Sequence, residues 1–252
     1  SHTGAIAVNK IAEKVKQNKS SELDLVIIGG GVSGISAALQ AKKLNLNFKI
    51  YEAAEAFSTI VNFPKGKPIY TYPSEMIPDG DLQFSKNANT KEKLLDELKS
   101  QTKLNEIIPE IAKAEKIEKT NDGYLTHFLN KEMVKSSHVI IAIGRSGNFR
   151  KLGVKGEYLP KVYNRLHDPK EFANKNILVV GGGDSALETA IAIAEADGNV
   201  TISYRNPEFN RPKQENIQKL NDLEELGKIK KLMGSSLAEI NDHEVKLKLS
   251  SN

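Results

Sequence analysis

Two parts of the chain show the same order of apolar and small residues. An apolar run at 25–28 precedes a glycine-rich turn, a helical stretch at 35–44 and a second predicted strand at 47–51. The order returns from the apolar run that begins at residue 177, and its second predicted strand lies at 200–204. Short, continuous apolar runs are typical of strands buried on both faces of a parallel sheet. The pattern therefore predicts two strand-helix-strand units in one chain.

Other stretches complete the predicted fold. A helix is predicted over 91–103, a hairpin around Asn121-Asp122-Gly123 and a further strand over 138–143. The predicted fold class is α/β, with two Rossmann-like dinucleotide-binding domains. Their parallel sheets are expected to carry helices on both faces, with a small antiparallel hairpin element in addition.

The chain is expected to divide at two boundaries. Residues 1–22 are interpreted as an N-terminal helical leader and linker, because Ile11 and Val15 stand four apart and a polar run follows them. Residues 23–147 contain the first glycine turn and residues 148–252 contain the second. Each of these two parts is expected to form one dinucleotide-binding domain.

Composition excludes several classes of protein. Of the 252 residues, 39% are hydrophobic and 27% are charged, and no apolar run reaches the roughly 18 residues of a membrane span. The net charge is only +4 and the lysines are scattered, so no nucleic-acid partner is expected. Cysteine is absent and the histidines lack metal-ligand spacing, so neither a redox dithiol nor a metal site is expected. A cytoplasmic location is the default interpretation.

The first glycine turn carries a phosphate-binding pattern. Gly29, Gly31 and Gly34 form G-x-G-x-x-G directly after a strand, with Ser33 inside the motif and Glu52 ending the next strand. The first glycine permits a tight turn, the second lets the backbone approach a pyrophosphate, and the third lets helix and strand pack closely. The helix N-terminus favours the phosphate charge, and Glu52 is placed to accept hydrogen bonds from an adenosine ribose.

The second glycine turn repeats this pattern. Gly181, Gly183 and Ala186 form G-x-G-x-x-A after the strand, with Asp184 and Ser185 between them. These five residues are the candidate contacts for a second pyrophosphate.

The strand after the second turn ends in Tyr204-Arg205 instead of an acid, and Arg211 follows closely. A guanidinium group suits a ribose 2′-phosphate, so these three residues are candidate contacts that favour NADPH over NADH. An arginine at a strand end is also commonly only solvated, so NADH stays open as the alternative.

Three motifs follow one another along the chain: G-G-G-V-S-G with Glu52, V-I-I-A-I-G at 139–144, and V-V-G-G-G-D-S-A at 179–186. In this order they resemble the thioredoxin-reductase-like flavoproteins of the pyridine nucleotide-disulfide oxidoreductase family. The resemblance implies that the first domain holds FAD, that Ala142 and Gly144 close over it, and that the second domain binds NADPH.

One departure from that family concerns its redox centre. Where thioredoxin reductases carry Cys-x-x-Cys-Asp, residues 164–168 read N-R-L-H-D. The chain therefore resembles the subset without the dithiol, which includes ferredoxin-NADP reductases and reductases of small disulfides. His167 and Asp168 are candidates for a proton donor near the flavin, and the alternative is a loop pair that packs between the domains.

A second departure concerns the flavin domain. The family returns after its nicotinamide domain with a strand and a Gly-Asp motif, which this chain lacks. The resemblance therefore implies that residues 23–147 form an incomplete FAD-binding domain, that residues 148–252 form the NAD(P)-binding domain, and that FAD is held weakly or not at all. The leader also indicates a larger parent polypeptide.

The main functional hypothesis is an NAD(P)H-dependent flavoprotein oxidoreductase, which passes hydride from NADPH to FAD and electrons to an external acceptor. Two alternatives stay open. One is a flavin monooxygenase, which shares two dinucleotide motifs, and the other is a non-catalytic nucleotide-binding or electron-relay module of a larger protein. Assembly as a homodimer is also left open.

Overall fold

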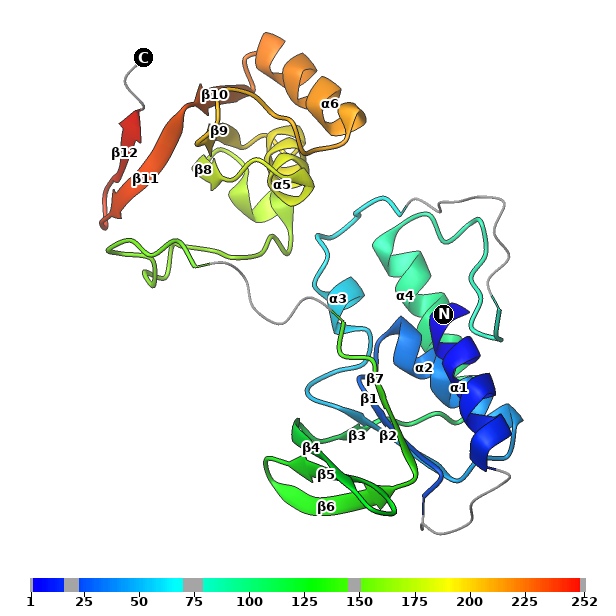
Figure 1. Ribbon diagram of the computed structural model, residues 1–252. Helices are drawn as coiled ribbons and strands as arrows, with labels where there is room; N and C mark the ends of the chain where they lie inside the picture. Colours follow the sequence, from blue (N-terminus) through cyan, green and yellow to red (C-terminus); the bar gives the residue numbers. More distant parts are fainter. Residues whose placement is uncertain (1, 16–22, 70–78, 145–150, 250–252) are drawn as a thin grey trace. The chain divides into compact units, whose positions relative to one another are not determined.

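The computed structural model describes the following residues: 2–15, 23–69, 79–144 and 151–249. They belong to two compact units, which span Ser1–Gly147 and Asn148–Asn252 (Figure 1). The predicted linker at 16–22 lies outside the described residues. Among the helices of the described ranges, none combines the length and the hydropathy that crossing a membrane requires.

A four-stranded parallel sheet forms the centre of the first unit. Its strands have the order β3-β2-β1-β7, and every neighbouring pair is parallel, as the continuous apolar runs predict. The strands are β1 Leu25–Ile28, β2 Phe48–Glu52, β3 Glu110–Ile111 and β7 His138–Ile141. The helices are α1 His2–Val15, α2 Val32–Lys43, α3 Ser58–Val61 and α4 Lys91–Leu104.

The two faces of this sheet pack against different layers (Figure 1). Leu25 and Ile27 of β1 are fully buried in the core that α1, α2 and α4 complete. Val26 and Ile28, which alternate with them, pack on the opposite face with Phe128 of an antiparallel sheet. That sheet consists of β4 Ala114–Thr120, β5 Gly123–Phe128 and β6 Lys131–Ser136. Helices therefore cover one face, and antiparallel strands take the place of the helices expected on the other.

The N-terminal helix α1 is a layer of the first unit. It packs along α2 so closely that a Cβ on Gly4 would lie 2.2 Å from the backbone oxygen of Ser33. Val8 is buried in the core of the unit, and Asn9 Oδ1 accepts a hydrogen bond of 2.6 Å from the side chain of Gln40 in α2. The helix predicted as a leader therefore buries apolar surface in the unit that follows it.

The second unit contains a three-stranded parallel sheet in the order β10-β9-β8. Its strands are β8 Asn176–Val180, β9 Asn199–Tyr204 and β10 Ile229–Met233. Its helices are α5 Asp184–Glu195, α6 Gln214–Glu225 and the short 3₁₀ helix η1 Pro169–Phe172. Val179 and Ile202 share one buried core with Leu187 of α5 and Leu220 of α6, so both long helices cover the same face.

An antiparallel hairpin lies beside the other face of this sheet (Figure 1). It consists of β11 Ser235–Ile240 and β12 Val245–Leu249. The hydroxyl groups of Ser203 in β9 and Ser235 in β11 are 2.7 Å apart and buried. Because Ser203 alternates with buried Ile202, this contact lies on the face away from the helices.

The predicted fold class is confirmed as α/β, with parallel sheets, helices and small antiparallel elements. The predicted hairpin forms between β4 and β5, with Thr120 paired to Gly123 across the turn. β6 adds a third strand that the sequence analysis does not predict.

Candidate functional site

The first glycine turn brings the three motif glycines together. Gly29 has a φ of +111°, and its N–H donates a hydrogen bond of 2.7 Å to the carbonyl of Tyr51 in β2. A Cβ on Gly34 would lie 1.8 Å from the Gly29 oxygen, so only glycine lets α2 pack this closely on the turn. A Cβ on Gly31 would meet nothing within 4 Å. The turn therefore leaves open space at the N-terminus of α2, where an anion is favoured.

Glu52 ends β2 beside this turn. Its Oε2 accepts a hydrogen bond of 2.6 Å from the N–H of Gly30, and its Oε1 accepts one of 3.1 Å from the N–H of Ala54. The Gly30 oxygen accepts a further hydrogen bond of 3.0 Å from the N–H of Phe57. The carboxylate is therefore held in one orientation at the turn, and a carboxylate oxygen that accepts one hydrogen bond can accept a second.

The chain that follows β7 runs beside the same turn. The N–H of Ala142 donates a hydrogen bond of 2.7 Å to the last residue of β1, and a Cβ on Gly29 would lie 2.4 Å from the Ala142 oxygen. Gly144 has a φ of +68°, a conformation that favours glycine. Ile141 and Ile143 are 63% and 69% exposed, so apolar side chains stand uncovered next to Ala142.

The second turn has the geometry of the first. Gly181 has a φ of +148°, and its N–H donates a hydrogen bond of 3.0 Å to a carbonyl of β9. A Cβ on Gly181 would lie 3.0 Å from that of Ala186, whereas a Cβ on Gly183 would meet nothing within 4 Å. Ser185, like Ser33 at the equivalent place in the first turn, is exposed at the start of its helix. Both turns thus present the same open space at a helix N-terminus.

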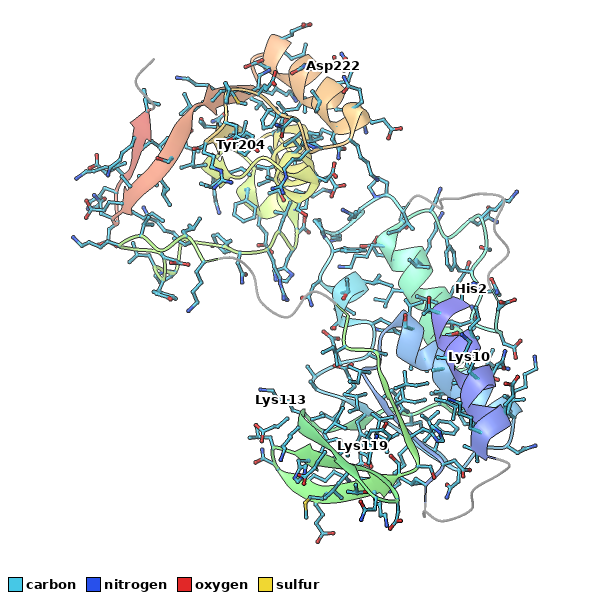
Figure 2. All side chains as sticks on the ribbon, viewed as in Figure 1. His2, Lys10, Lys113, Lys119, Tyr204 and Asp222 are labelled. Carbon is cyan, nitrogen blue, oxygen red and sulfur yellow. The ribbon has the colours of Figure 1, made fainter. Side chains whose placement is uncertain are left out.

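The motif does not single out the middle glycine of the second turn. A Cβ on Gly182 would lie 2.2 to 2.3 Å from three ring carbons of Tyr204, the last residue of β9 (Figure 2). This ring stacks on Phe209, with centroids 5.4 Å apart, and its hydroxyl accepts a hydrogen bond of 3.0 Å from Asn206. Tyr204, a predicted cofactor contact, is therefore packed over the turn. In the sequence, the only sign of the contact between Gly182 and Tyr204 is the run of three glycines. The motif G-x-G-x-x-A itself allows any residue at position 182.

Two predicted arginines lie on the loop between β9 and α6. Arg205 and Arg211 are exposed, and neither makes a hydrogen bond or an ion pair with another residue that the structure describes. Their guanidinium groups are therefore available to an anion near the carboxyl end of β9.

Asp184, the first residue of α5, contacts the far end of this loop. Its Oδ1 accepts hydrogen bonds of 2.9 Å from the N–H of Lys213 and 2.8 Å from the side chain of Asn216. Lys213 is the N-cap residue of α6 and Asn216 lies in its first turn. The start of the second glycine-turn helix is thus joined to the start of the next helix.

The pair His167 and Asp168 precedes η1 in the second unit. Asp168 Oδ1 accepts a hydrogen bond of 3.0 Å from the N–H of Lys170 and so caps that helix, while His167 is exposed. Capping gives the acid a structural role at this position. The role of the pair as proton donors stays a prediction.

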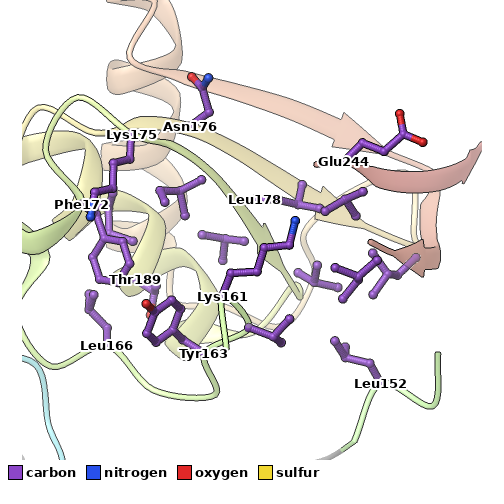
Figure 3. A pocket seen from close by; sticks show the side chains of 18 of the residues that line it. Leu152, Lys161, Tyr163, Leu166, Phe172, Lys175, Asn176, Leu178, Thr189 and Glu244 are labelled. Carbon is purple, nitrogen blue, oxygen red and sulfur yellow. The ribbon is translucent and has the colours of Figure 1, made fainter. Parts of the chain in front are cut away.

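A cavity of about 620 Å³ lies elsewhere in the second unit (Figure 3). Tyr163, Phe172 and Leu178 contribute to its apolar wall, and Lys161 and Glu244 also line it. None of the predicted nucleotide-binding residues takes part. The two glycine turns, and not this cavity, therefore form the candidate site.

The fold and the two turns define a protein with two Rossmann-type dinucleotide-binding units. A family model described as pyridine nucleotide-disulphide oxidoreductase matches residues 26–252. The chain therefore belongs to the pyridine nucleotide-disulphide oxidoreductase family, which confirms the resemblance seen in its motifs.

Two curated relatives illustrate the family. The chain is 30% identical over 189 residues to a ferredoxin–NADP reductase of Ignicoccus hospitalis, a match that covers 75% of this chain and 58% of the relative. It is 26% identical to a bacilliredoxin reductase of Bacillus subtilis, over 73% of this chain and 58% of the relative. The matched part is thus less than two thirds of the length of either relative.

Solved structures show the same fold. Bacillithiol disulfide reductase from Staphylococcus aureus gives a TM-score of 0.80 at 21% identity, covering 91% of this chain and 72% of that chain. Thioredoxin reductase from T. acidophilum gives a TM-score of 0.67 at 23% identity, covering 90% and 73%. At these identities the comparison concerns the fold alone, and it agrees with two Rossmann-type units.

Proposed function

We propose that this chain binds FAD at the first turn and NADPH at the second, as part of an NADPH-dependent flavoprotein oxidoreductase. Residues 23–147 then form the FAD-binding domain and residues 148–252 the NAD(P)-binding domain. The family match and the ferredoxin–NADP reductase among the relatives support this proposal. The electron acceptor is proposed to be a separate molecule.

The observation that carries the proposal is the opposite charge at two equivalent strand ends. β2 ends in Glu52, whose carboxylate is fixed at the first turn by the N–H of Gly30. β9 is followed by Arg205, whose side chain has no partner among the residues described. A carboxylate accepts hydrogen bonds from ribose hydroxyl groups and repels a 2′-phosphate, whereas a guanidinium attracts one. Two turns of one geometry thus suit two different dinucleotides.

Both turns fit a pyrophosphate. A Cβ at Gly31 or at Gly183 would meet nothing within 4 Å, so the protein leaves space there for a ligand. The N–H groups and the partial positive charge of a helix N-terminus favour an anion in that space. With both dinucleotides bound, the nicotinamide supplies a hydride and the flavin accepts it.

The proposed role of this chain's own residues is to bind and orient the two dinucleotides. We propose that Glu52 accepts hydrogen bonds from the FAD ribose and that Arg205 and Arg211 bind the 2′-phosphate of NADPH. Ile141 and Ile143 offer apolar surface that excludes water from one side of the first site. The 252 residues contain no cysteine, so no thiol within them relays electrons to the acceptor.

The test uses the 252-residue chain with FAD and with NADPH. Equilibrium dialysis measures the binding of each dinucleotide alone, and anaerobic addition of NADPH or NADH to the FAD-loaded chain is followed in the visible flavin band. We expect both dinucleotides to bind, FAD only weakly, and NADPH to bleach the band faster than NADH when FAD is supplied in excess.

Two matched variants assign each dinucleotide to its turn. Gly31→Ala and Gly183→Ala each add a methyl group that meets no described residue within 4 Å apart from its neighbours along the chain, at extended backbone that alanine also adopts. We expect Gly31→Ala to weaken FAD alone and Gly183→Ala to weaken NADPH alone. Loss of the same dinucleotide in both variants would contradict the proposal. Oxygenation of an added substrate would favour the flavin monooxygenase alternative instead.

A further inference from the structure

The loop that carries Arg205 and Arg211 is fastened to the second glycine turn at both of its ends. At its start, Tyr204 packs over Gly182, and Asn206 donates a hydrogen bond of 3.0 Å to the Tyr204 hydroxyl. At its end, the Asp184 carboxylate holds the first residues of α6. We call these two contacts, Tyr204 on Gly182 and Asp184 on the start of α6, the anchors of the loop. Arg205 and Arg211 lie between them.

The anchor at the end of the loop depends on one side chain. Asp184 Oδ1 accepts two hydrogen bonds, 2.9 Å from the N–H of Lys213 and 2.8 Å from Asn216 Nδ2. Lys213 stands two residues after Arg211, and no side chain within α6 caps that helix. Asp184 therefore acts as the cap of a helix to which it does not belong.

A negative charge at this position needs an explanation if a pyrophosphate binds at the same turn. The helix dipole stabilises a carboxylate at the helix N-terminus, but the carboxylate repels a phosphate group nearby. Hydrogen bonds from Lys213 and Asn216 turn Oδ1 toward α6 and offset its charge. The geometry of Asp184 thus suits an anchor of the loop better than a contact to the nucleotide.

We propose that Asp184 is a positioning residue for 2′-phosphate recognition, because it holds the arginine loop against the glycine turn without touching the nucleotide. This inference rests on the proposed binding of NADPH at the second turn. Arg205 continues directly from β9, whereas Arg211 depends on the distal anchor. Loss of that anchor should therefore cost the contact that Arg211 makes, and leave pyrophosphate binding intact.

The test compares NADP⁺ with NAD⁺, which differ only in the 2′-phosphate, by calorimetric titration of the 252-residue chain. In Asp184→Ala we expect the preference for NADP⁺ to fall roughly tenfold, as for the loss of one charge-assisted hydrogen bond, with NAD⁺ affinity unchanged. Asp184→Asn keeps an oxygen that accepts both hydrogen bonds, so it should keep the preference. Glu195→Ala, which removes an exposed acid at the other end of α5, is the matched control.

Hydrogen exchange of residues 205–213, measured by mass spectrometry without nucleotide, reports on the anchor directly. We expect faster exchange in Asp184→Ala than in Asp184→Asn or the parent chain. Unchanged exchange in Asp184→Ala would refute the anchoring, and equal weakening of NADP⁺ and NAD⁺ would refute the role in 2′-phosphate recognition. If the unsubstituted 252-residue chain binds neither NADP⁺ nor NAD⁺, the proposed function itself is refuted. The exchange measurement still tests the anchoring in that case, because it needs no nucleotide.

Discussion

Replacing Gly182 by alanine tests whether the second turn is built around the Tyr204 ring. The new Cβ would lie 2.2 to 2.3 Å from three carbons of that ring, whereas carbon atoms in contact are normally about 3.5 to 4.0 Å apart. The ring therefore has to move by more than an ångström. The ring is stacked on Phe209 and its hydroxyl accepts a hydrogen bond from Asn206, so its movement disturbs both contacts.

The cost can be worked out from these contacts. Overpacking a well-packed site costs about 1 to 3 kcal/mol, and the loss of one hydrogen bond adds about 1 kcal/mol. We therefore expect Gly182→Ala to lower the free energy of unfolding of the second unit by roughly 2 to 4 kcal/mol. In a domain of about 100 residues, this lowers Tm by roughly 10 °C or more.

The assay is thermal unfolding with and without NADPH, compared between Gly182→Ala and Gly183→Ala. A Cβ on Gly183 meets nothing within 4 Å, so that variant should unfold like the parent chain but lose its stabilisation by NADPH. Combining Gly182→Ala with Tyr204→Leu should cost less than the two single substitutions together, since the smaller side chain leaves room for the methyl group. A Gly182→Ala chain as stable as the parent would refute the reasoning.

Three further predictions follow from other residues. Arg205→Ala should weaken NADPH by about 1 to 3 kcal/mol and leave NADH unchanged, and equal losses in a binding titration would remove Arg205 from the 2′-phosphate site. Gly4→Val should destabilise the first unit by roughly 2 kcal/mol or more in denaturant unfolding, because the side chain collides with the oxygen of Ser33, while Lys10→Ala on the exposed face should have no effect. Tyr51→Phe should raise the unfolding free energy by about 1 kcal/mol, since the buried hydroxyl of Tyr51 has no hydrogen-bond partner among the described residues. Burial also raises the pKa of this phenol. A loss of stability would show that the hydroxyl is satisfied.

Much of the fold could be predicted from short-range patterns. The apolar run at 25–28 coincides with β1, and the apolar run from residue 177 with the last four residues of β8. Strands buried on both faces leave this signal in the sequence itself. The positions of the motif glycines could also be predicted, because tight turns and close helix packing exclude larger residues there.

Other elements leave weak signals. α6 is missing from the prediction because Leu220 is its only fully buried residue within the described chain, so its apolar spacing is hard to recognise. β12 alternates apolar residues with lysines over only five positions, and β10, which reads Ile-Lys-Lys-Leu-Met, is equally short and lacks a regular alternation. Such short runs fit a strand and an exposed loop equally well.

Contacts between distant residues account for what the motifs leave out at the candidate site. Asp184 reaches partners 29 and 32 positions further along the chain, and Glu52 reaches Gly30 across 22 positions. A local motif identifies these acids but not their partners. Only the folded chain shows that Glu52 faces its turn while Asp184 faces the next helix.

The close contact of α1 with α2 bears on how this unit can be moved between proteins. A boundary drawn from the motifs would start the unit near Leu23 and discard a helix that supplies Val8 to the core. Grafted in that form, the nucleotide-binding module would carry an apolar groove along α2 and a tendency to associate with other chains. The transferable module therefore includes the N-terminal helix, and domain shuffling that omits it would need a substitute for its buried face.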